Sequence, residues 1–203
     1  MSVFTGPLNN VATKKELIFE FDSILPMWLE NSVTESFYRF PLEYNHHVYD
    51  DDNCPFFGKQ IYHEEYGVDN SIPPVVFTLI KCIENELIHK IDDNATFGGL
   101  KRVIVNGQTS VNNPPPHMDD DENRDMWTAL YYVTDSDGDT AFYKKRSEMQ
   151  EVHRASYKQG KFVIFPSSFM HQGLPPNDGW RVSIGFMFRM NCKYNKFIFS
   201  ERD

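Results

Sequence analysis

The sequence predicts a mainly β fold with supporting helices, and three observations favour it. Aromatic residues, which favour strands, make up 15% of the 203 residues, with 17 Phe and 10 Tyr. After Gly98-Gly99, short β-rich runs alternate with turns rich in Gly, Pro, Asn and Asp. Before that point, one long amphipathic helical pattern precedes the β-rich part. These patterns are typical of a β-sandwich or barrel with helices packed against it.

The part before residue 98 contains two helical patterns and one short strand pattern. We expect a strand at 16–21. Asp22 or Ser23 is a candidate N-cap for a helix that ends near Ser36. Apolar residues recur at steps of three and four over 75–92, which predicts an amphipathic helix with proline at its start.

The segment 37–72 is rich in Tyr, Pro, Asp and Asn and lacks a clean period, so we expect loops and short strands there. Within it, 44–66 is a candidate lid over a site. We expect one domain over 1–203, in which 1–98 supplies supporting helices and lid-like loops and 99–190 forms the core. The strand-like runs of the core are LKRVIVNGQTS (100–110), MWTALYYVT (126–134), DTAFYKK (139–145), GKFVIFP (160–166) and WRVSIGFMFRM (180–190).

Charge and cysteine content narrow the function classes. The formal net charge is −9 and the pI about 5.2, which disfavours a nucleic-acid partner, because binding to phosphates needs an excess of Lys and Arg. Cys54, Cys82 and Cys192 are far apart and form no CxxC pair, which favours a reducing compartment. The sequence has no signal-peptide pattern and no apolar run of membrane-spanning length. We therefore expect a cytoplasmic protein without a membrane partner.

Three residues form a candidate metal site. His117 and Asp119 are two apart, so in an extended segment both side chains lie on the same face. His171 follows a strand-like run fifty-two residues after Asp119. Two histidines and one carboxylate make the facial triad of non-haem Fe(II) oxygenases, which leaves coordination positions open. A lone HxD pair is common by chance, and for His117 alone a surface or core role is favoured.

Arg181 and Ser183 form a candidate anion site. They begin a strand-like segment ten residues after His171, and their spacing of two places them on the same face. A guanidinium beside a hydroxyl suits a carboxylate that is held bidentately. For Arg181 alone, a salt bridge to one of the many acidic residues is the favoured alternative.

With these residues in place, the chain resembles the prolyl 4-hydroxylase-like branch of the 2-oxoglutarate/Fe(II) dioxygenases, of the short bacterial and phage type. The resemblance covers about residues 100–190. Its marks are His117-Met-Asp119, TALYYV (128–133), DGDTAF (137–142), GKFVIFPSSFMHQG (160–173) and GWRVSIGFMF (179–188).

The resemblance implies a double-stranded β-helix, or jelly roll, with helices on its outer face. It implies that His117, Asp119 and His171 hold Fe(II), and that Arg181 binds the distal carboxylate of 2-oxoglutarate. It also places Tyr132 and Ser183 at that carboxylate. O₂ is the second co-substrate, and ascorbate is a further cofactor candidate.

One position departs from the family pattern. Thr140 lies where the family has a Gly-Gly-x-Thr-like turn, but Asp139 replaces the second glycine, which leaves the geometry of this turn open. The segment 1–95 is similar to short bacterial and phage members only in its general build, which is a loop, a tyrosine-rich segment and a helix. A phage-encoded protein that acts in a bacterial host fits this build.

The resemblance implies hydroxylation of an organic substrate with release of succinate and CO₂. A protein or peptide side chain such as proline is the leading substrate. The alternatives are the same chemistry on a small molecule or a nucleobase, and a non-catalytic metal-binding jelly-roll module. The acidic run Asp119–Glu122 is interpreted as a solvated loop, with a rim that attracts a basic substrate as the alternative. The sequence leaves the oligomeric state open.

Overall fold

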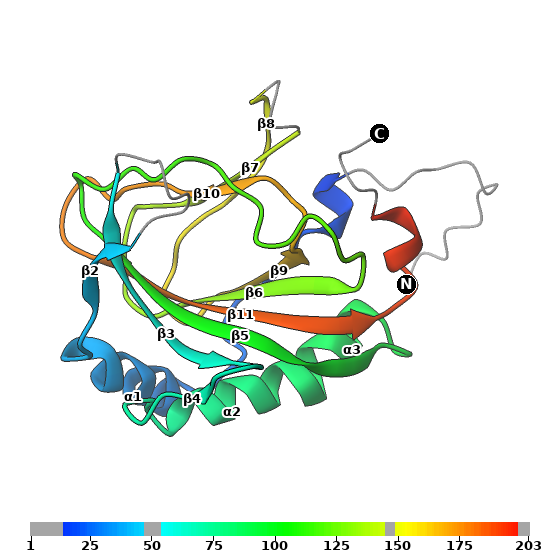
Figure 1. Ribbon diagram of the computed structural model, residues 1–203, viewed down its shortest axis with the longest axis horizontal. Coiled ribbons are helices and arrows are strands. Elements are labelled where there is room, and N and C mark those ends of the chain that lie inside the picture. Colours follow the sequence, from blue (N-terminus) through cyan, green and yellow to red (C-terminus); the bar gives the residue numbers. More distant parts are fainter. Residues whose placement is uncertain (1–13, 47–53, 145–148, 199–203) are drawn as a thin grey trace.

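The computed structural model describes residues 14–46, 54–144 and 149–198, and these form two β-sheets and a helical layer (Figure 1). The larger sheet has the order β1-β9-β6-β11-β5-β3-β2, with β4 beside β3, and the smaller has the order β10-β7-β8. The strands are β1 (Phe19–Phe21), β2 (Glu43–His46), β3 (Phe56–His63), β4 (Gly67–Val68), β5 (Thr96–Gln108), β6 (Met126–Tyr132), β7 (Thr140–Tyr143), β8 (Glu151–Ala155), β9 (Phe162–Pro166), β10 (His171–Gly173) and β11 (Arg181–Asn191).

The helices cover one face of the larger sheet, and the smaller sheet lies on its other side (Figure 1). The helices are α1 (Met27–Tyr38), α2 (Val75–Cys82) and α3 (Ile88–Ile91), and a π-helical turn (Ile83–Leu87) joins the last two. Short 3₁₀ turns lie at Lys14–Leu17 and Asn195–Phe197. The predicted mainly β fold with supporting helices is confirmed.

The helix predicted over 75–92 is confirmed as a continuous helical segment from Val75 to Ile91. Its apolar stripe is buried against the sheet, as the periodicity predicts. The buried residues are Val76, Leu79, Ile83, Leu87, Ile88 and Ile91. The helix ends where Asp92 turns extended, and Asp92 Oδ2 accepts a hydrogen bond of 2.8 Å from the amide of Lys193.

Two predictions for the first part of the chain need correction. The helix that we expected from Asp22 or Ser23 begins at Met27, with Pro26 as its N-cap and no side-chain cap. Proline disfavours the helical conformation in the residue before it, so the helix starts after Pro26. The strand expected over 16–21 is limited to Phe19–Phe21, because the preceding residues form a 3₁₀ turn.

The structure describes only part of the candidate lid at 44–66. Its second half is β3, a strand of the larger sheet that pairs with β5 from Phe57 to His63. Residues 56–63 alternate only weakly between apolar and polar types, and an irregularity between Gln60 and Tyr62 disturbs the register. β3 falls within 37–72, where the sequence predicted loops and short strands, and the weak alternation left its bounds undefined. Residues 47–53 of the expected lid lie outside the described residues.

Alternation along β5, β6 and β11 divides their side chains between two faces. One face packs into the core with the helices, through residues such as Val105, Ala129 and Ile184. The other face turns toward the smaller sheet and forms a pocket floor. Because side chains alternate with a period of two, one pattern of residues supplies both the core and the floor. The pocket therefore lies inside the fold, between the two sheets.

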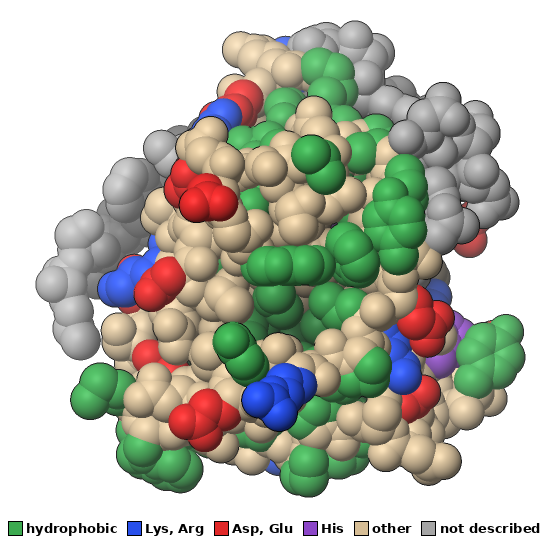
Figure 2. All heavy atoms as spheres, turned by 90° about the vertical axis from the view of Figure 1, so that its left-hand side faces the viewer, with side chains coloured by type: hydrophobic (Ala, Val, Ile, Leu, Met, Phe, Trp, Pro, Cys, Tyr) green, Lys and Arg blue, Asp and Glu red, His purple; other side chains and the backbone are tan. Residues whose placement is uncertain are grey.

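The face seen in Figure 2 carries a separate apolar hollow. It lies beside the end of α1 and near one end of strands β3, β6 and β11 of the larger sheet. The side chains that line it include Phe37, Phe40, Leu42, Phe57 and Trp180. Within the described residues, no helix has both the length and the apolar character that crossing a membrane requires.

Candidate active site

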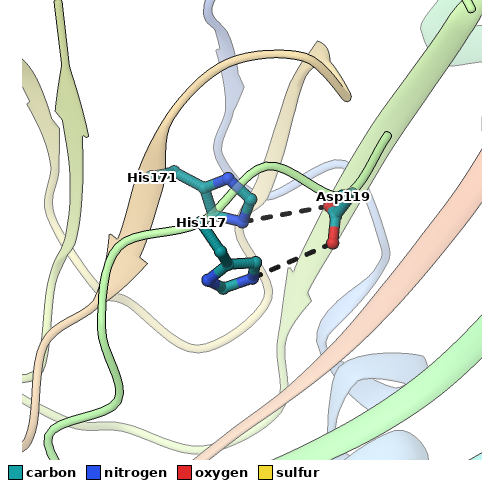
Figure 3. A group of neighbouring side chains, drawn as sticks. All are labelled: His117, Asp119 and His171. Carbon is teal, nitrogen blue, oxygen red and sulfur yellow. Dashed lines mark ion pairs between the residues drawn. The ribbon is translucent and has the colours of Figure 1, made fainter. Parts of the chain in front are cut away.

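His117 and His171 are brought together by an antiparallel bridge between two segments that are far apart in the sequence. The amide of His117 donates to the carbonyl of His171 at 2.9 Å, and the reverse hydrogen bond is 2.8 Å. Directly opposed residues of an antiparallel pair project to the same side. The two imidazole rings therefore lie side by side, with centroids 4.5 Å apart (Figure 3).

Asp119 completes the group. Its amide donates to the carbonyl of Ser167 at 2.9 Å, which fixes the backbone beside β9. Its two carboxylate oxygens each lie 3.9 Å from the Nε2 atom of one histidine (Figure 3). One ligand atom from each of the three residues lies within 4.8 Å of the others, so the predicted triad forms one cluster.

The imidazoles are oriented by backbone carbonyls. Nδ1 of His171 lies 2.9 Å from the carbonyl oxygen of Phe169, and Nδ1 of His117 lies 3.4 Å from that of Pro115. A neutral imidazole that donates from Nδ1 keeps its lone pair on Nε2. Both Nε2 atoms point toward Asp119, so the donor set of two imidazole nitrogens and one carboxylate oxygen fits a divalent transition metal.

The protonation states favour metal binding. Burial, together with the neighbouring His171, lowers the pKa of His117 to about 4, so this imidazole is neutral at pH 7. Burial acts to raise the pKa of Asp119, but His171, Arg102 and His117 shift it below its usual value, so the carboxylate is ionised. Thr128 Oγ1 donates to Asp119 Oδ2 at 2.7 Å, which fixes the plane of the carboxylate.

The pocket floor consists of four cross-strand rows from β6, β11 and β5. Their members are Thr128-Met187-Arg102, Leu130-Gly185-Ile104, Tyr132-Ser183-Asn106 and, from β11 and β5 alone, Arg181-Gln108. The first row lies at the metal end, because both Thr128 and Arg102 contact Asp119. The last row lies at the opposite end and holds Arg181. The pocket thus has the triad at one end and a buried guanidinium at the other.

Arg181 is held by neutral oxygen atoms. It is 3% exposed, and its Nε donates to the carbonyl of Gly138 at 2.7 Å. Nη1 donates to Gln108 Oε1 at 2.7 Å, and Nη2 donates to Thr140 Oγ1 at 2.9 Å. Across residues 14–46, 54–144 and 149–198, no carboxylate forms an ion pair with Arg181. A buried cation without an anionic partner is costly, so this end of the pocket fits an anionic ligand.

The hydroxyl groups around Arg181 have hydrogens left to donate. Tyr132 and Arg181 both donate to Thr140 Oγ1, at 2.7 and 2.9 Å, so the Thr140 hydrogen is available to another acceptor. Ser183 Oγ lies 3.4 Å from Nη1 of Arg181 as an acceptor. Arg181, Thr140 and Ser183 therefore offer donors to a carboxylate, which accepts up to about four hydrogen bonds.

Aromatic rings and two glycines shape the space around the guanidinium. Tyr132 stacks on Tyr157 with ring centroids 4.0 Å apart, and the Arg181 guanidinium lies 5.1 Å above the ring of Tyr157. A Cβ atom on Gly173 would lie 2.8 Å from Nη1 of Arg181, and one on Gly138 would lie 2.5 Å from the carbonyl of Leu174. Only glycine fits these positions without displacement.

Asp139, which departs from the family pattern, has a structural role in this turn. Its carboxylate accepts a hydrogen bond of 2.8 Å from the amide of Tyr157, and its carbonyl accepts one from the amide of Leu174. The side chain therefore anchors the segment that carries Tyr157 to the turn before β7.

The structure brings all six predicted site residues to one region. His117, Asp119, His171, Arg181 and Ser183 line the pocket, and Tyr132 donates to Thr140, which also accepts a hydrogen bond from Arg181. Of the acidic run, Asp119 alone lines this pocket, whereas Asp121 and Glu122 line a separate shallow depression. Sequence reasoning missed several residues of the site, namely Arg102, Gln108, Thr128, Gly138, Tyr157 and Gly173.

One signal in the sequence was available for part of this group. Thr128 is four residues before Tyr132, so alternation already places it on the same face of β6. Arg102 and Gln108 also share a face, but the pairing of β5 with β11 that brings them to the site is visible only in the structure.

Comparison with known proteins agrees with this geometry. Residues 108–189 match the family model described as the 2OG-Fe(II) oxygenase superfamily, a span that includes the triad and Arg181. The chain carries a 2OG-Fe(II) oxygenase domain. It is an enzyme of the class that uses Fe(II) and 2-oxoglutarate, and the resemblance found in the sequence is confirmed at this level. No curated protein matches the chain.

Solved structures of 2OG-Fe(II) oxygenases share the fold of this chain at low sequence identity. A prolyl-4-hydroxylase from Pseudomonas putida has a TM-score of 0.63 and 14% identity, over 85% of this chain and 92% of that one. A prolyl hydroxylase from Trichoplax adhaerens, in complex with a hypoxia-inducible-factor peptide, has a TM-score of 0.59 and 16% identity, over 86% and 84%. HygX from Streptomyces hygroscopicus, with nickel, 2-oxoglutarate and hygromycin B bound, has a TM-score of 0.58 and 12% identity, over 88% and 84%. The predicted jelly-roll fold is confirmed.

Proposed function

We propose that this 2OG-Fe(II) oxygenase hydroxylates an organic substrate, with a protein or peptide side chain such as proline as the leading candidate. The reaction consumes the substrate, O₂ and 2-oxoglutarate and yields the hydroxylated product, succinate and CO₂. The observation that carries the proposal is Arg181, a buried guanidinium without a carboxylate partner among the described residues, in the same pocket as the His-Asp-His cluster.

In this proposal His117, Asp119 and His171 hold Fe(II). Bound Fe(II), together with 2-oxoglutarate, supplies the oxidising chemistry. A divalent ion held by two imidazoles and one carboxylate carries a net positive charge, which attracts a dianionic co-substrate. Thr128 and the carbonyls of Pro115 and Phe169 keep the three ligand side chains in place, so little reorganisation accompanies metal binding.

Arg181 binds and orients the distal carboxylate of 2-oxoglutarate, with Thr140 and Ser183 as further donors. Tyr132 acts through Thr140, whose oxygen its hydroxyl contacts. The rings of Tyr132 and Tyr157 exclude water from this end, because both are buried. Low local polarity strengthens the contact between the guanidinium and the carboxylate.

Similar structures support the leading substrate and one alternative. The matching structures include prolyl hydroxylases, which favours a prolyl side chain. The HygX structure holds hygromycin B, so a small-molecule substrate is the second candidate. In this proposal the same metal and 2-oxoglutarate sites serve either a prolyl side chain or a small-molecule substrate.

Two measurements test the proposal. Binding of 2-oxoglutarate to the Mn(II)-loaded protein should be measurable by calorimetry, and it should be lost in His117→Ala. Succinate release should rise when Fe(II)-loaded protein is given prolyl peptides. A wild-type protein that binds no 2-oxoglutarate would overturn the assignment. Binding of 2-oxoglutarate without succinate release under any condition would favour the non-catalytic module.

A further inference from the structure

Arg102 is a second arginine in the pocket, at the end opposite Arg181. It lies in the first row of the floor, in register with Met187 and Thr128. Arg102, Ile104, Asn106 and Gln108 of β5 all line the pocket, as alternate residues of one strand do. From Arg102 to Gln108 the strand advances about 20 Å. The two guanidinium groups of the pocket are thus attached at opposite ends of its floor.

The hydrogen-bonding capacity of Arg102 is mostly unused. Its Nη2 donates to Asp119 Oδ1 at 3.3 Å, and its side chain is 30% exposed. Within the part of the chain that the structure describes, no other partner of this guanidinium is found, although an arginine carries about five N–H donors. Arg189 of β11 provides a contrast, because Nη1 and Nη2 both contact the carboxylate of Glu64, at 3.0 and 3.4 Å.

The charges of the pocket leave Arg102 uncompensated once the co-substrate is bound. Among the described residues that line the pocket, Asp119 is the one carboxylate, and Arg102 and Arg181 are the two cations. A divalent ion raises the net charge of these groups to three positive charges. The dianion 2-oxoglutarate balances two of them. One positive charge remains, and one further negative charge would balance it. The distal carboxylate of 2-oxoglutarate binds at the Arg181 end, whereas Arg102 lies at the opposite end.

We propose that Arg102 binds a carboxylate group of the substrate beside the metal end of the pocket, so that the enzyme selects substrates with a singly charged acid near the oxidised carbon. This inference rests on the proposed function. The planar fork of a guanidinium matches a carboxylate with two hydrogen bonds. A single negative charge completes the balance, whereas a phosphate dianion would exceed it.

The acidic run next to the site does not occupy Arg102. The Asp120 carboxylate forms an ion pair with Lys101 Nζ at 3.4 Å and accepts a hydrogen bond of 2.9 Å from the amide of Asn123. Asp121 and Glu122 line a different depression. A substrate acid therefore meets Arg102 without competition from these side chains, and the ionised Asp119 is shared with the metal.

The inference is tested by binding of matched acids and amides. The protein is loaded with Mn(II) and 2-oxoglutarate, which prevents turnover, and is titrated with free L-amino acids and N-acetylated prolyl dipeptides. Each compound is used as the carboxylate and as the primary amide. Wild-type protein should bind at least one acid about tenfold or more tightly than its amide, the equivalent of one good contact. The two compound sets distinguish a free amino acid from the end of a peptide.

Variants assign this preference to Arg102. In Arg102→Gln the preference for the acid should fall to less than about twofold, and Arg102→Lys should keep part of it. Arg189→Gln removes the same charge from a neighbouring strand and should keep the full preference. The affinity for 2-oxoglutarate should be unchanged in Arg189→Gln, and the Arg102 variants are titrated with 2-oxoglutarate at a concentration that saturates each of them.

Several outcomes would overturn the inference. One is equal binding of acid and amide, or no binding of any acid, by wild-type protein that binds 2-oxoglutarate normally. Another is an Arg102→Gln protein that binds metal weakly and loses acid and amide affinity equally, because Arg102 would then only position Asp119. If 2-oxoglutarate itself fails to bind wild-type protein, the proposed function fails, and this inference fails with it.

Discussion

At one end of the pocket Arg181 is buried among neutral oxygens, and at the other Arg102 is partly exposed and contacts an ionised carboxylate. The first guanidinium has fixed partners on two strands and in a turn, with aromatic rings beside it. The second has one partner and spare donors. The difference indicates that the Arg181 end is preorganised for one constant ligand, whereas the metal end can accept a variable one.

The largest effect is expected from removing a ligand at the metal end. Asp119→Ala should weaken Mn(II) binding by more than about 100-fold, because even partners that only orient a metal ligand contribute about 10–100-fold. Calorimetric titration with Mn(II) measures it. Asp121→Ala, two residues along in the same acidic run, is the control and should bind Mn(II) like wild type. Equal losses in both variants would mean that the acidic loop acts only through its overall charge.

Removal of Arg181 should affect the opposite end alone. Arg181→Ala should weaken 2-oxoglutarate binding by about 2–5 kcal/mol, the usual cost of truncating one partner of a buried charge pair. This corresponds to roughly 30- to 4000-fold in Kd, whereas Mn(II) affinity should stay within about twofold of wild type. Arg189→Ala is the control for charge, and unchanged 2-oxoglutarate affinity in Arg181→Ala would contradict the assignment.

A smaller effect is expected at the hydrogen bond that orients Asp119. Thr128→Val keeps the shape of the side chain but removes the donor at 2.7 Å from Asp119 Oδ2. Mn(II) affinity should fall by about 10–100-fold. Thr128→Ser, which keeps the hydroxyl, should restore most of the affinity. If valine and serine behave alike, the hydroxyl does not act on the metal end.

The smallest effect separates two neighbouring tyrosines. Tyr132→Phe removes a hydrogen bond to Thr140 and should weaken 2-oxoglutarate binding by about 0.5–1.5 kcal/mol. Tyr131→Phe is matched to it, because the Tyr131 hydroxyl is buried without a hydrogen-bond partner in the described structure. Removal of this hydroxyl should leave the 2-oxoglutarate affinity unchanged, and the melting temperature of the variant should equal or exceed that of wild type. A loss of 2-oxoglutarate affinity in Tyr131→Phe but not in Tyr132→Phe would contradict the placement of the co-substrate on the Tyr132 face of β6.

Much of this arrangement could be predicted from sequence patterns of short range. The spacing of two between His117 and Asp119 and the apolar steps over 75–92 each depend on a single segment. Both segments form in the structure, the second as a helix from Val75 to Ile91. The start of α1 was missed because capping residues precede Pro26, and the bounds of β3 were not predicted because its alternation is weak.

The second end of the pocket could not be predicted in the same way. Arg102 is one of several cations in a strand pattern, and its role depends on register with Met187 and Thr128 on two other strands. Cross-strand register depends on packing over the whole sheet, which a single sequence does not display. The same holds for Tyr157, which meets Arg181 only through folding of the smaller sheet.

The alternation of side chains along β5 between the pocket and the core determines which insertions and deletions this strand tolerates. Arg102 and Gln108 face the pocket while Val103 and Val105 face the core, so deletion of one residue before them would exchange the two sets. Cationic and amide groups would then enter the core, and valines would line the site. Insertions and deletions within β5 should therefore be accepted only in pairs.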